Sequence, residues 1–223
     1  MRLMSPVASV IYLHGFASSP ESSKAQRFAR ELGARGVGFS CPDFNEPAFE
    51  TLTVTRMLDQ TAAAIAAASA TPVALVGSSL GAFVAVHAAV RDARRERPRV
   101  DRLVLLAPAL DFGGNRLRQL GEHGIDEWRR AGKLRVFHYA HNTERDVDFA
   151  LHEDAARYDA FSVNLDLPML VFQGTRDASV DPSMVQRWAA TRPNVDLRRL
   201  DDEHQLTTSI EEIWRSSAAF FGL

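Results

Sequence analysis

The segment 72–90 constrains the fold more than any other part of the sequence. An apolar run is followed by the sequence G-S-S-L-G at Gly77 to Gly81, and a helix-forming stretch comes directly after it. A chain that turns this sharply from strand to helix brings two backbones together, and glycines two residues either side of the centre leave room for the contact. The spacing predicts a strand–turn–helix unit with Ser79 at its strained centre. Ser78 does not fit, because Val76 stands where the first glycine would be needed.

The same pattern is typical of the nucleophile elbow of serine hydrolases. A serine hydroxyl is a poor nucleophile by itself, so this interpretation requires a base and an acid, which follow the serine in the order acid, then base. Asp177 follows the apolar run 167–172, and His204 follows the short predicted strand 195–200. Catalytic groups collect at the carboxyl ends of strands in open α/β sheets. We therefore predict Ser79 as nucleophile, His204 as base and Asp177 as acid.

Two other carboxylates lie close to these positions in the sequence. Asp181 precedes Pro182, which is typical of a helix N-cap followed by proline at the first helical position. Asp181 stays open as the alternative acid. Glu203 is adjacent to His204, but neighbouring residues in a strand or loop usually point apart.

Six apolar runs predict strands, and helical segments alternate with them. The strands are expected at 7–13, 37–41, 73–76, 103–106, 169–172 and 195–200, and the helices at 21–34, 54–68, 80–91, 182–190 and 208–220. Apolar runs without alternation indicate parallel strands covered on both faces, so we predict an α/β fold with a doubly wound, mostly parallel six-stranded sheet. Ser19 and Pro20 are expected to open the first helix, and Gly36 to end it.

One connection breaks this rhythm. Residues 112–166, between predicted strands four and five, form a segment that is too long for a simple loop. We therefore expect this segment to contain secondary structure of its own. We predict a small, mostly helical cap over the carboxyl edge, inserted into a single domain that spans 1–223. Its aromatic residues give it material for packing: Trp128, Phe137, Tyr139, Phe149, Tyr158 and Phe161.

Composition excludes several function classes. The chain is 46% hydrophobic and 24% charged, as expected of a globular protein, and its net charge of −2 gives no reason to expect a nucleic-acid partner. No apolar stretch is long enough to span a bilayer, and the N-terminus lacks the apolar region of a signal peptide. Cys41 is the only cysteine, which excludes an internal disulfide or a thiolate metal cluster. We expect a cytoplasmic protein without a membrane partner, with Cys41 as a small buried apolar residue.

The loop after the first predicted strand is expected to lie beside the elbow. A tetrahedral intermediate needs two hydrogen-bond donors aimed at its oxyanion. The backbone N–H of Leu80, at the start of its helix, is one candidate, and that of Phe16 is the other. His14 is expected to bond the loop backbone rather than take part in catalysis, and Gly15 to permit a close approach.

This loop also carries a family resemblance. The sequence from Tyr12 to Ala25 reads Y-L-H-G-F-x-S-S-P-x-S-x-K-A. Together with the elbow, it resembles the α/β-hydrolase superfamily and, more narrowly, the small bacterial YqiA-like esterases. The close match covers only the first strand and helix. The resemblance implies hydrolysis of esters or thioesters without a cofactor. The sequence departs from the superfamily before the base, where a glycine is common and residues 201–203 are acidic.

Other polar residues are assigned simpler roles. His138, His141 and His152, near Asp146 and Asp148, have irregular spacing, and no metal site is predicted. Lys24 is expected to be a solvated lysine on the first helix. A basic set in the first half of the cap is interpreted as an exposed helix face, with binding of an anionic head such as coenzyme A phosphates as the alternative. The set comprises Arg116, Arg118, Arg129, Arg130, Lys133 and Arg135.

These observations together predict a serine esterase that acts on carboxylic esters or acyl thioesters through an acyl-enzyme. A dedicated acyl-CoA thioesterase or a peptidase on the same fold is the alternative among enzymes. A non-catalytic binding protein on a hydrolase scaffold is the alternative from another class. The predicted partner is a small-molecule ester or thioester, no cofactor or metal is expected, and the oligomeric state stays open.

Overall fold

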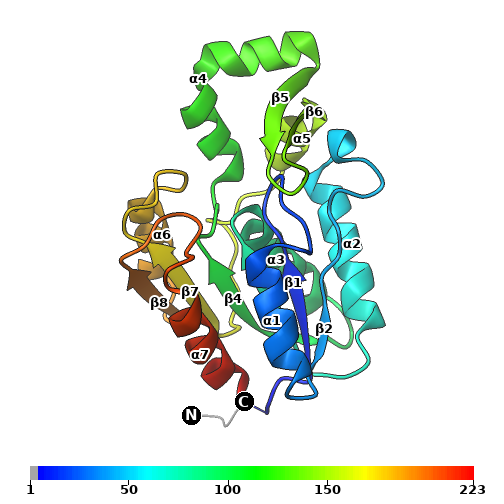
Figure 1. Cartoon of the computed structure of the whole chain (residues 1–223), viewed down its shortest axis with the longest axis vertical. Helices are drawn as coiled ribbons and strands as arrows, with labels where there is room; N and C mark the ends of the chain where they lie inside the picture. Colours follow the sequence, from blue (N-terminus) through cyan, green and yellow to red (C-terminus); the bar gives the residue numbers. More distant parts are fainter. Residues whose placement is uncertain (1–4) are drawn as a thin grey trace.

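The computed structural model describes residues 5–223, apart from the side chains of residues 113–118. A single parallel sheet of six strands lies between two layers of helices (Figure 1). In spatial order the strands are β2 (Gly38–Ser40), β1 (Ser9–Leu13), β3 (Val73–Ser78), β4 (Val100–Leu106), β7 (Met169–Gly174) and β8 (Val195–Leu200). Every residue of β1, β3 and β7 is buried, as the apolar runs predict for central parallel strands. The predicted fold class is confirmed.

Helices cover both faces of this sheet. On one face, α1 (Ser23–Gly33) and α7 (Ile210–Phe221) pack Phe28 and Trp214 against Tyr12 of β1. On the other face lie α2 (Val54–Ala67), α3 (Leu80–Ala93) and α6 (Pro182–Ala190), which contact the core around Ile11. Tyr12 and Ile11 are neighbours on one strand and therefore point to opposite faces. The sheet thus divides the core into two apolar layers.

The start of α1 differs from the sequence prediction. The helix begins at Ser23, not at Pro20. The Ser19 hydroxyl accepts a hydrogen bond from the N–H of Glu21 at 3.2 Å, and the N–H of Ser22 bonds the carbonyl of Ser19. A serine that bonds the backbone two residues on stabilises a turn instead of a helix start. Ser19 therefore shapes the loop that reaches the helix.

The parallel register brings four loops to one edge of the sheet. Leu13 pairs with Gly77, Ser78 with Leu106, and Gly174 with Leu200, so β1, β3, β7 and β8 end near one another. The loops that follow these strands carry the candidate site residues. The charged edge strand β8 closes one side of the sheet, as is common for strands that must not pair further.

The insertion between β4 and β7 contains an element that the sequence analysis missed. Helices α4 (Phe112–Ala131) and α5 (Ala150–Ala155) fit the predicted helical cap, but β5 (Lys133–His138) and β6 (Thr143–Asp148) form an antiparallel hairpin between them. Gly132 ends α4 in a left-handed conformation with φ 74°. The exposure of β5 alternates along the strand, which is the pattern of a hairpin with one covered face.

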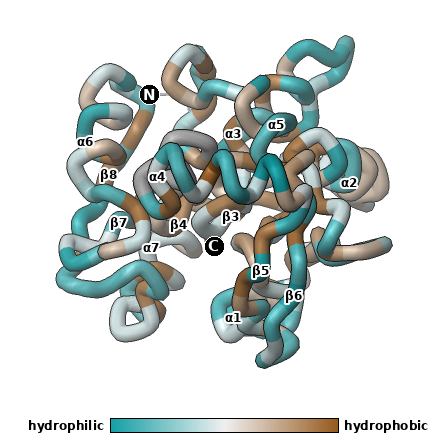
Figure 2. The backbone as a smooth tube through the Cα atoms, turned by 90° about the horizontal axis from the view of Figure 1, so that it is seen from above, coloured by the Kyte–Doolittle hydropathy of each residue, from teal (hydrophilic) through white to brown (hydrophobic). Residues whose placement is uncertain are grey.

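The insertion lies across the edge at which the four loops meet (Figure 2). In this view the hairpin runs out beside α1. The N–H of Ala140, in the hairpin turn, donates to the carbonyl of Ala17 in the β1–α1 loop at 3.4 Å. Arg145 of β6 pairs with Glu50 of the 3₁₀ helix η1 (Phe49–Thr51) at 2.9 Å. These contacts fix the hairpin over the loop that precedes α1.

Two further predictions concern the burial of Cys41 and membrane-spanning helices. Cys41 is half-buried beside the α1 face of the sheet rather than fully buried, and burial raises the pKa of its thiol to about 12. Within the described part of the chain, no helix combines the length and the apolar character needed to cross a bilayer.

Candidate active site

Ser79 occupies the sharp turn between β3 and α3. Its backbone has φ 54° and ψ −115°, a conformation that a non-glycine residue adopts only at a cost. A methyl group on Gly81 would collide with the carbonyl of Leu13, and one on Gly77 would collide with the backbone of Gly81. The two glycines are therefore required by close backbone packing, as the sequence pattern predicts. The turn presents the Ser79 side chain at the edge of the sheet.

A chain of hydrogen bonds joins the three residues predicted from the sequence. His204 Nε2 lies 3.2 Å from Ser79 Oγ, and His204 Nδ1 lies 2.9 Å from Asp177 Oδ2. The Asp177 side chain is fully buried, whereas that of His204 is one-fifth exposed. The structure therefore brings together a serine, a histidine and a carboxylate that are 125 and 27 residues apart along the chain. This order of groups is that of a serine–histidine–acid triad.

The environment of Asp177 favours the carboxylate form. Burial raises its pKa, but hydrogen bonds from His204, the N–H of Val180 and Gln173 outweigh burial and hold the pKa of Asp177 below its ordinary value. Its Oδ1 accepts from the N–H groups of Ser179 and Val180, each at 2.8 Å. A carboxylate that is ionised and fully bonded keeps its position toward the imidazole.

Gln173 is a site residue that the sequence analysis missed. It is buried at the end of β7, and its Nε2 donates to Asp177 Oδ2 at 3.0 Å. A polar side chain at the end of an otherwise apolar strand is a signal that could have indicated this role.

The loop that carries His204 is shaped by Asp202. Its Oδ1 accepts from the N–H of Glu203 and its Oδ2 from the N–H of Ser209, both within 2.9 Å. The loop also packs against Gly174, where an added methyl carbon would lie 2.6 Å from the carbonyl oxygen of Asp202. Asp202 therefore holds the backbone of the loop on both sides of His204.

The other two carboxylates take different places. Asp181 is the N-cap of α6 and accepts from the N–H of Ser183 at 2.9 Å, as predicted. Glu203 is exposed, whereas His204 next to it turns toward Asp177.

The loop after β1 packs directly on the elbow. A methyl group on Gly15 would lie 3.2 Å from the carbonyl oxygen of Ser78 and 3.4 Å from Ser79 Cβ, so Gly15 permits this approach. Leu80 is the first residue of α3, and its N–H has no acceptor within the helix. Phe16 and Leu80 both line the cavity that contains Ser79. The two predicted oxyanion donors therefore belong to adjacent backbone segments.

His14 has the structural role expected from the sequence. It is buried, its Nδ1 lies 2.9 Å from the carbonyl oxygen of Gly15, and its Nε2 accepts from the N–H of Phe44 at 2.9 Å. Because Nε2 accepts, Nδ1 carries the proton and donates to Gly15. His14 thus joins the β1–α1 loop to the segment after β2.

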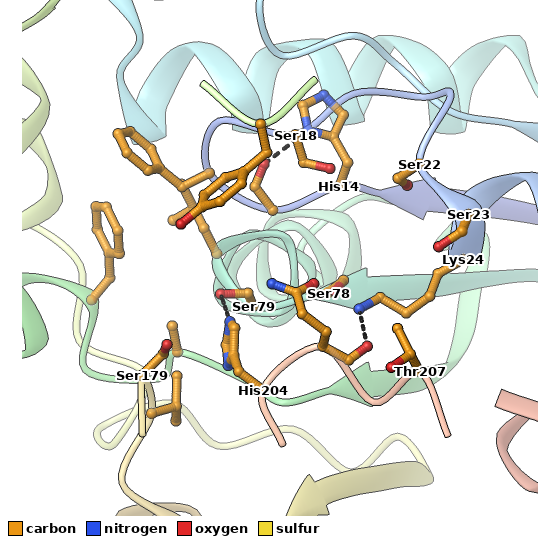
Figure 3. A pocket seen from close by; sticks show the side chains of 18 of the residues that line it. His14, Ser18, Ser22, Ser23, Lys24, Ser78, Ser79, Ser179, His204 and Thr207 are labelled. Carbon is orange, nitrogen blue, oxygen red and sulfur yellow. Dashed lines mark hydrogen bonds between the residues drawn. The ribbon is translucent and has the colours of Figure 1, made fainter. Parts of the chain in front are cut away.

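A cavity of about 640 Å³ contains Ser79 and His204. Figure 3 shows the two side chains in the middle, with Lys24, Ser22, Ser23 and Thr207 to one side and aromatic rings on the other. The cavity is lined by side chains from the elbow, the β1–α1 loop, α1, the hairpin and the His204 loop. Its apolar lining includes Phe16, Phe112, Val136, Phe137, Tyr139 and Val180.

Lys24 is not the solvated lysine that the sequence analysis predicts. It lines the cavity, is half-buried, and donates from Nζ to the carbonyl oxygen of Gln205 at 2.6 Å. Burial lowers the pKa of Lys24 to about 8, against the opposing effect of Asp202 and Asp177. From the sequence alone, a lysine on the first turn of a helix is expected to be exposed. In the folded chain, the loop that carries His204 lies beside it.

The described basic residues of the insertion do not line the cavity. Arg116 and Arg118 fall outside the described side chains. Arg129 pairs with Asp126, Arg130 donates to the carbonyl oxygen of Asp126, and Arg135 pairs with Asp146, so all three described arginines of the set have partners within the insertion. Among the described residues, no group of three or more histidine, cysteine or acidic residues is arranged to hold a metal ion.

Sheet order, elbow and helix layers together define an α/β-hydrolase fold. A protein of Agrobacterium vitis S4 that is named a hydrolase has 23% identity, a TM-score of 0.86, and coverage of 96% of this chain and 88% of that one. The mouse alpha/beta hydrolase domain-containing protein 10 has 18% identity, a TM-score of 0.78, and coverage of 97% and 91%. Est1E from Butyrivibrio proteoclasticus, with ferulic acid bound, has 18% identity, a TM-score of 0.78, and coverage of 96% and 88%. At these identities the likeness shows the fold alone.

Residues 9–221 match the model of the uncharacterised protein family UPF0227, and the chain belongs to that family. No curated protein matches the sequence.

Proposed function

We propose that this protein is a serine hydrolase that cleaves carboxylic esters or acyl thioesters through an acyl-enzyme. The observation that carries the proposal is the hydrogen-bonded series Ser79, His204 and Asp177, of which Ser79 and His204 line a cavity of about 640 Å³. A histidine between a serine hydroxyl and a buried carboxylate is suited to move a proton at the moment of nucleophilic attack.

The first half of the reaction forms the acyl-enzyme. Asp177 accepts a hydrogen bond from the Nδ1–H of His204, which leaves Nε2 unprotonated toward Ser79. His204 takes the hydroxyl proton as Ser79 Oγ attacks the acyl carbonyl. The resulting imidazolium is stabilised by the Asp177 carboxylate, and His204 then gives the proton to the leaving alkoxide or thiolate.

The second half releases the acid. A water molecule takes the place of the departed alcohol or thiol, and His204 removes its proton as the water attacks the acyl carbon. The carbonyl then re-forms, and His204 returns the proton to Ser79 Oγ. Atoms balance with one water consumed per ester bond cleaved, and no cofactor is needed.

The backbone N–H groups of Leu80 and Phe16 are the proposed oxyanion donors. Both residues line the cavity, and the packing of Gly15 on the elbow brings their segments together. Donors that are held in place before the reaction stabilise the developing negative charge without reorganisation.

The insertion, 112–166, is proposed to act as a cap that sets substrate size within one domain. Phe137 and Tyr139 of the hairpin region line the cavity, whereas Phe149 is buried against Trp128. Phe137 and Tyr139, together with Phe112 at the start of α4, can therefore contact an acyl chain directly, whereas Phe149 cannot.

Covalent labelling with a fluorophosphonate probe tests the proposal. The wild-type protein is expected to be labelled once, on Ser79, and Ser79→Ala to lose both the label and the hydrolysis of 4-nitrophenyl acetate. Ser78→Ala is the matched variant, and its labelled peptide should still carry the probe on Ser79. Far-ultraviolet circular dichroism checks that each variant is folded. A label that persists in folded Ser79→Ala would show that the nucleophile lies elsewhere.

A further inference from the structure

We propose that Lys24 selects substrates that carry a carboxylate, by binding that group at the polar end of the cavity. This inference rests on the proposed ester hydrolysis and names the substrate class for the same site. The carboxylate would lie in the part of the substrate that extends from Ser79 toward α1. The apolar part would lie toward the hairpin.

The position of Lys24 in the cavity is the first observation. Its side chain reaches from the first turn of α1 into the space beside the Ser79–His204 pair (Figure 3). Lys24 and Lys133 are the only lysines in a sequence whose other cations are arginines. Lys133 is exposed on β5. The chain thus has one lysine that lines the cavity and one exposed lysine that does not.

The second observation is that Lys24 keeps donors for a ligand. Within the described part of the chain, its one hydrogen-bond acceptor is the carbonyl oxygen of Gln205. An ammonium group has three N–H donors, so two remain for a substrate. The nearby acids Asp177 and Asp202 are bonded to His204 and to the backbone of their own loop. Neither forms an ion pair with Lys24 that would neutralise it.

The surroundings of the ammonium suit an anion. Ser22, Ser23 and Thr207 line the same end of the cavity and supply hydroxyl donors. The positive end of the α1 dipole adds to the charge of Lys24, because the first-turn N–H groups of a helix have no partner within it. With a pKa of about 8, Lys24 is mostly protonated at pH 7. A half-buried cation next to hydroxyls binds an oxyanion more strongly than an exposed one would.

A single negative charge fits this place better than a phosphate does. A phosphate monoester carries a charge of about −1.5 to −2 at pH 7, which more than one cation is needed to neutralise. The arginine closest along α1, Arg27, is paired with Glu211 at 2.8 Å and with Glu31 at 3.3 Å. No arginine is among the described residues that line this cavity, so the single charge of Lys24 matches the single charge of a carboxylate.

Paired esters test this selection. One series places the charge in the acyl part: 4-nitrophenyl monoesters of glutaric, adipic and pimelic acid, each compared with the ester whose far end is a carboxamide. A second series places it in the alcohol part: 4-acetoxybenzoate compared with 4-acetoxybenzamide. The readout is the ratio of kcat/KM for the charged ester over its neutral partner. It is measured for the wild type, Lys24→Met, Lys24→Arg and the matched surface variant Lys133→Met.

We expect a wild-type ratio above one in one of the two series. Lys24→Met should lower that ratio on the order of 10- to 100-fold, as expected for the loss of a hydrogen-bonded charge. Lys24→Arg should retain part of the preference, and Lys133→Met should keep the wild-type ratio. A Lys24 that only supports the His204 loop through Gln205 would slow both members of each pair equally. An unchanged ratio in Lys24→Met, or no preference in either series, would overturn the inference.

The design separates this inference from the proposed function. If the wild type hydrolyses none of these esters, or if Ser79→Ala hydrolyses them as well as the wild type does, the proposed function fails. If hydrolysis depends on Ser79 but the ratio does not depend on Lys24, only the inference about the carboxylate fails.

Discussion

The parallel sheet and the insertion between β4 and β7 are held together by different means. The sheet positions its loops through buried strands in fixed register, and Ser79, Asp177 and His204 all follow such strands. The insertion is joined to the rest by side chains: Trp128 and Leu151 belong to the apolar cluster that contains Ile11 of β1, and polar contacts add to this packing. Asp154 of α5 accepts from the N–H and hydroxyl of Thr55 at 2.6 and 2.7 Å.

This contrast teaches where precision is needed and where variation is tolerated. A nucleophile, a base and an acid must keep their distances to a fraction of an ångström, and rigid strand ends provide that. The part of the cavity wall that only contacts the substrate has to fit its shape but has no reacting group to hold in place. Loops or hairpins on a scaffold can vary there at little cost to the stability of the core. The following changes test this division, starting with the largest expected effect.

Asp177→Asn should lower kcat on the order of 10⁴-fold, because an amide at this place favours the wrong tautomer of His204. Asp181→Asn is the matched control, since asparagine caps a helix about as well as aspartate and the variant should keep wild-type turnover. Steady-state hydrolysis of 4-nitrophenyl acetate measures both. The opposite ranking of the two variants would make Asp181 the acid and overturn the assignment of Asp177.

Phe149→Ala should destabilise the protein by about 3–5 kcal/mol, because it removes a buried ring that packs edge-on against Trp128 with centroids 5.4 Å apart. Phe137→Ala, at a ring that is 42% exposed, should change the free energy of unfolding by about 0.5 kcal/mol or less. It should instead shift the preferred acyl length, because Phe137 lines the cavity.

Urea unfolding and a series of 4-nitrophenyl esters of rising chain length measure these two effects. If folded Phe137→Ala lost turnover of the acetate and of long-chain esters equally, the hairpin would belong to the catalytic apparatus. The contrast between the two regions would then be wrong.

Low pH should lower the free energy of unfolding at the contact between α3 and the insertion. His87 of α3 is buried against Tyr158, and burial lowers the pKa of His87 to about 4. The unfolded chain takes up this proton below about pH 6.5 and the folded chain does not, so stability falls as the pH drops from about 6.5 to about 4. The loss for His87 is on the order of 3 kcal/mol.

Urea unfolding at pH 7.5 and at pH 4.5 measures this loss. His87→Phe, which keeps an aromatic ring in the same place, should reduce the difference between the two pH values. His123→Gln, at an exposed histidine of α4, should leave the difference as in the wild type. Equal acid sensitivity in His87→Phe and the wild type would contradict a role for His87.

The preference for a carboxylate should also depend on pH, with a smaller effect. Lys24 loses its charge as the pH rises through about 8, and the groups that face it, Asp202 and Asp177, stay ionised throughout. The ratio of kcat/KM for charged over neutral ester should therefore fall between about pH 7 and 9. In Lys24→Arg the ratio should stay level over this range, because arginine keeps its charge. A wild-type ratio that is constant with pH would contradict binding by Lys24.

The smallest expected effect concerns the ion pair between Arg145 of the hairpin and Glu50 of η1. Glu50→Gln should cost about 1 kcal/mol or less, because the partly exposed pair with Arg145 is screened by solvent. The cost should shrink further in 1 M salt. Arg135→Gln, whose pair with Asp146 lies within the hairpin, is the control for the loss of any surface charge. A cost well above 1 kcal/mol would mean that this tie, and not packing, holds the insertion.

Local patterns in the sequence determine much of this protein. The apolar runs predict all six sheet strands, the glycines around Ser79 predict the elbow, and Asp181 before Pro182 predicts the start of α6. These features depend on backbone sterics and on neighbours within a few residues, so they can be read along the chain. The elbow also indicates which residue is the candidate nucleophile.

The tertiary structure alone decides which distant groups meet. The alternation along β5 is too short to distinguish a strand from a helix, and its pairing with β6 depends on the return of the chain after His138. Lys24 and Gln173 look like an ordinary surface lysine and a strand-end glutamine until folding brings the His204 loop to one and Asp177 to the other. Burial, and with it the pKa of a side chain, depends on such long-range contacts, which local sequence does not encode.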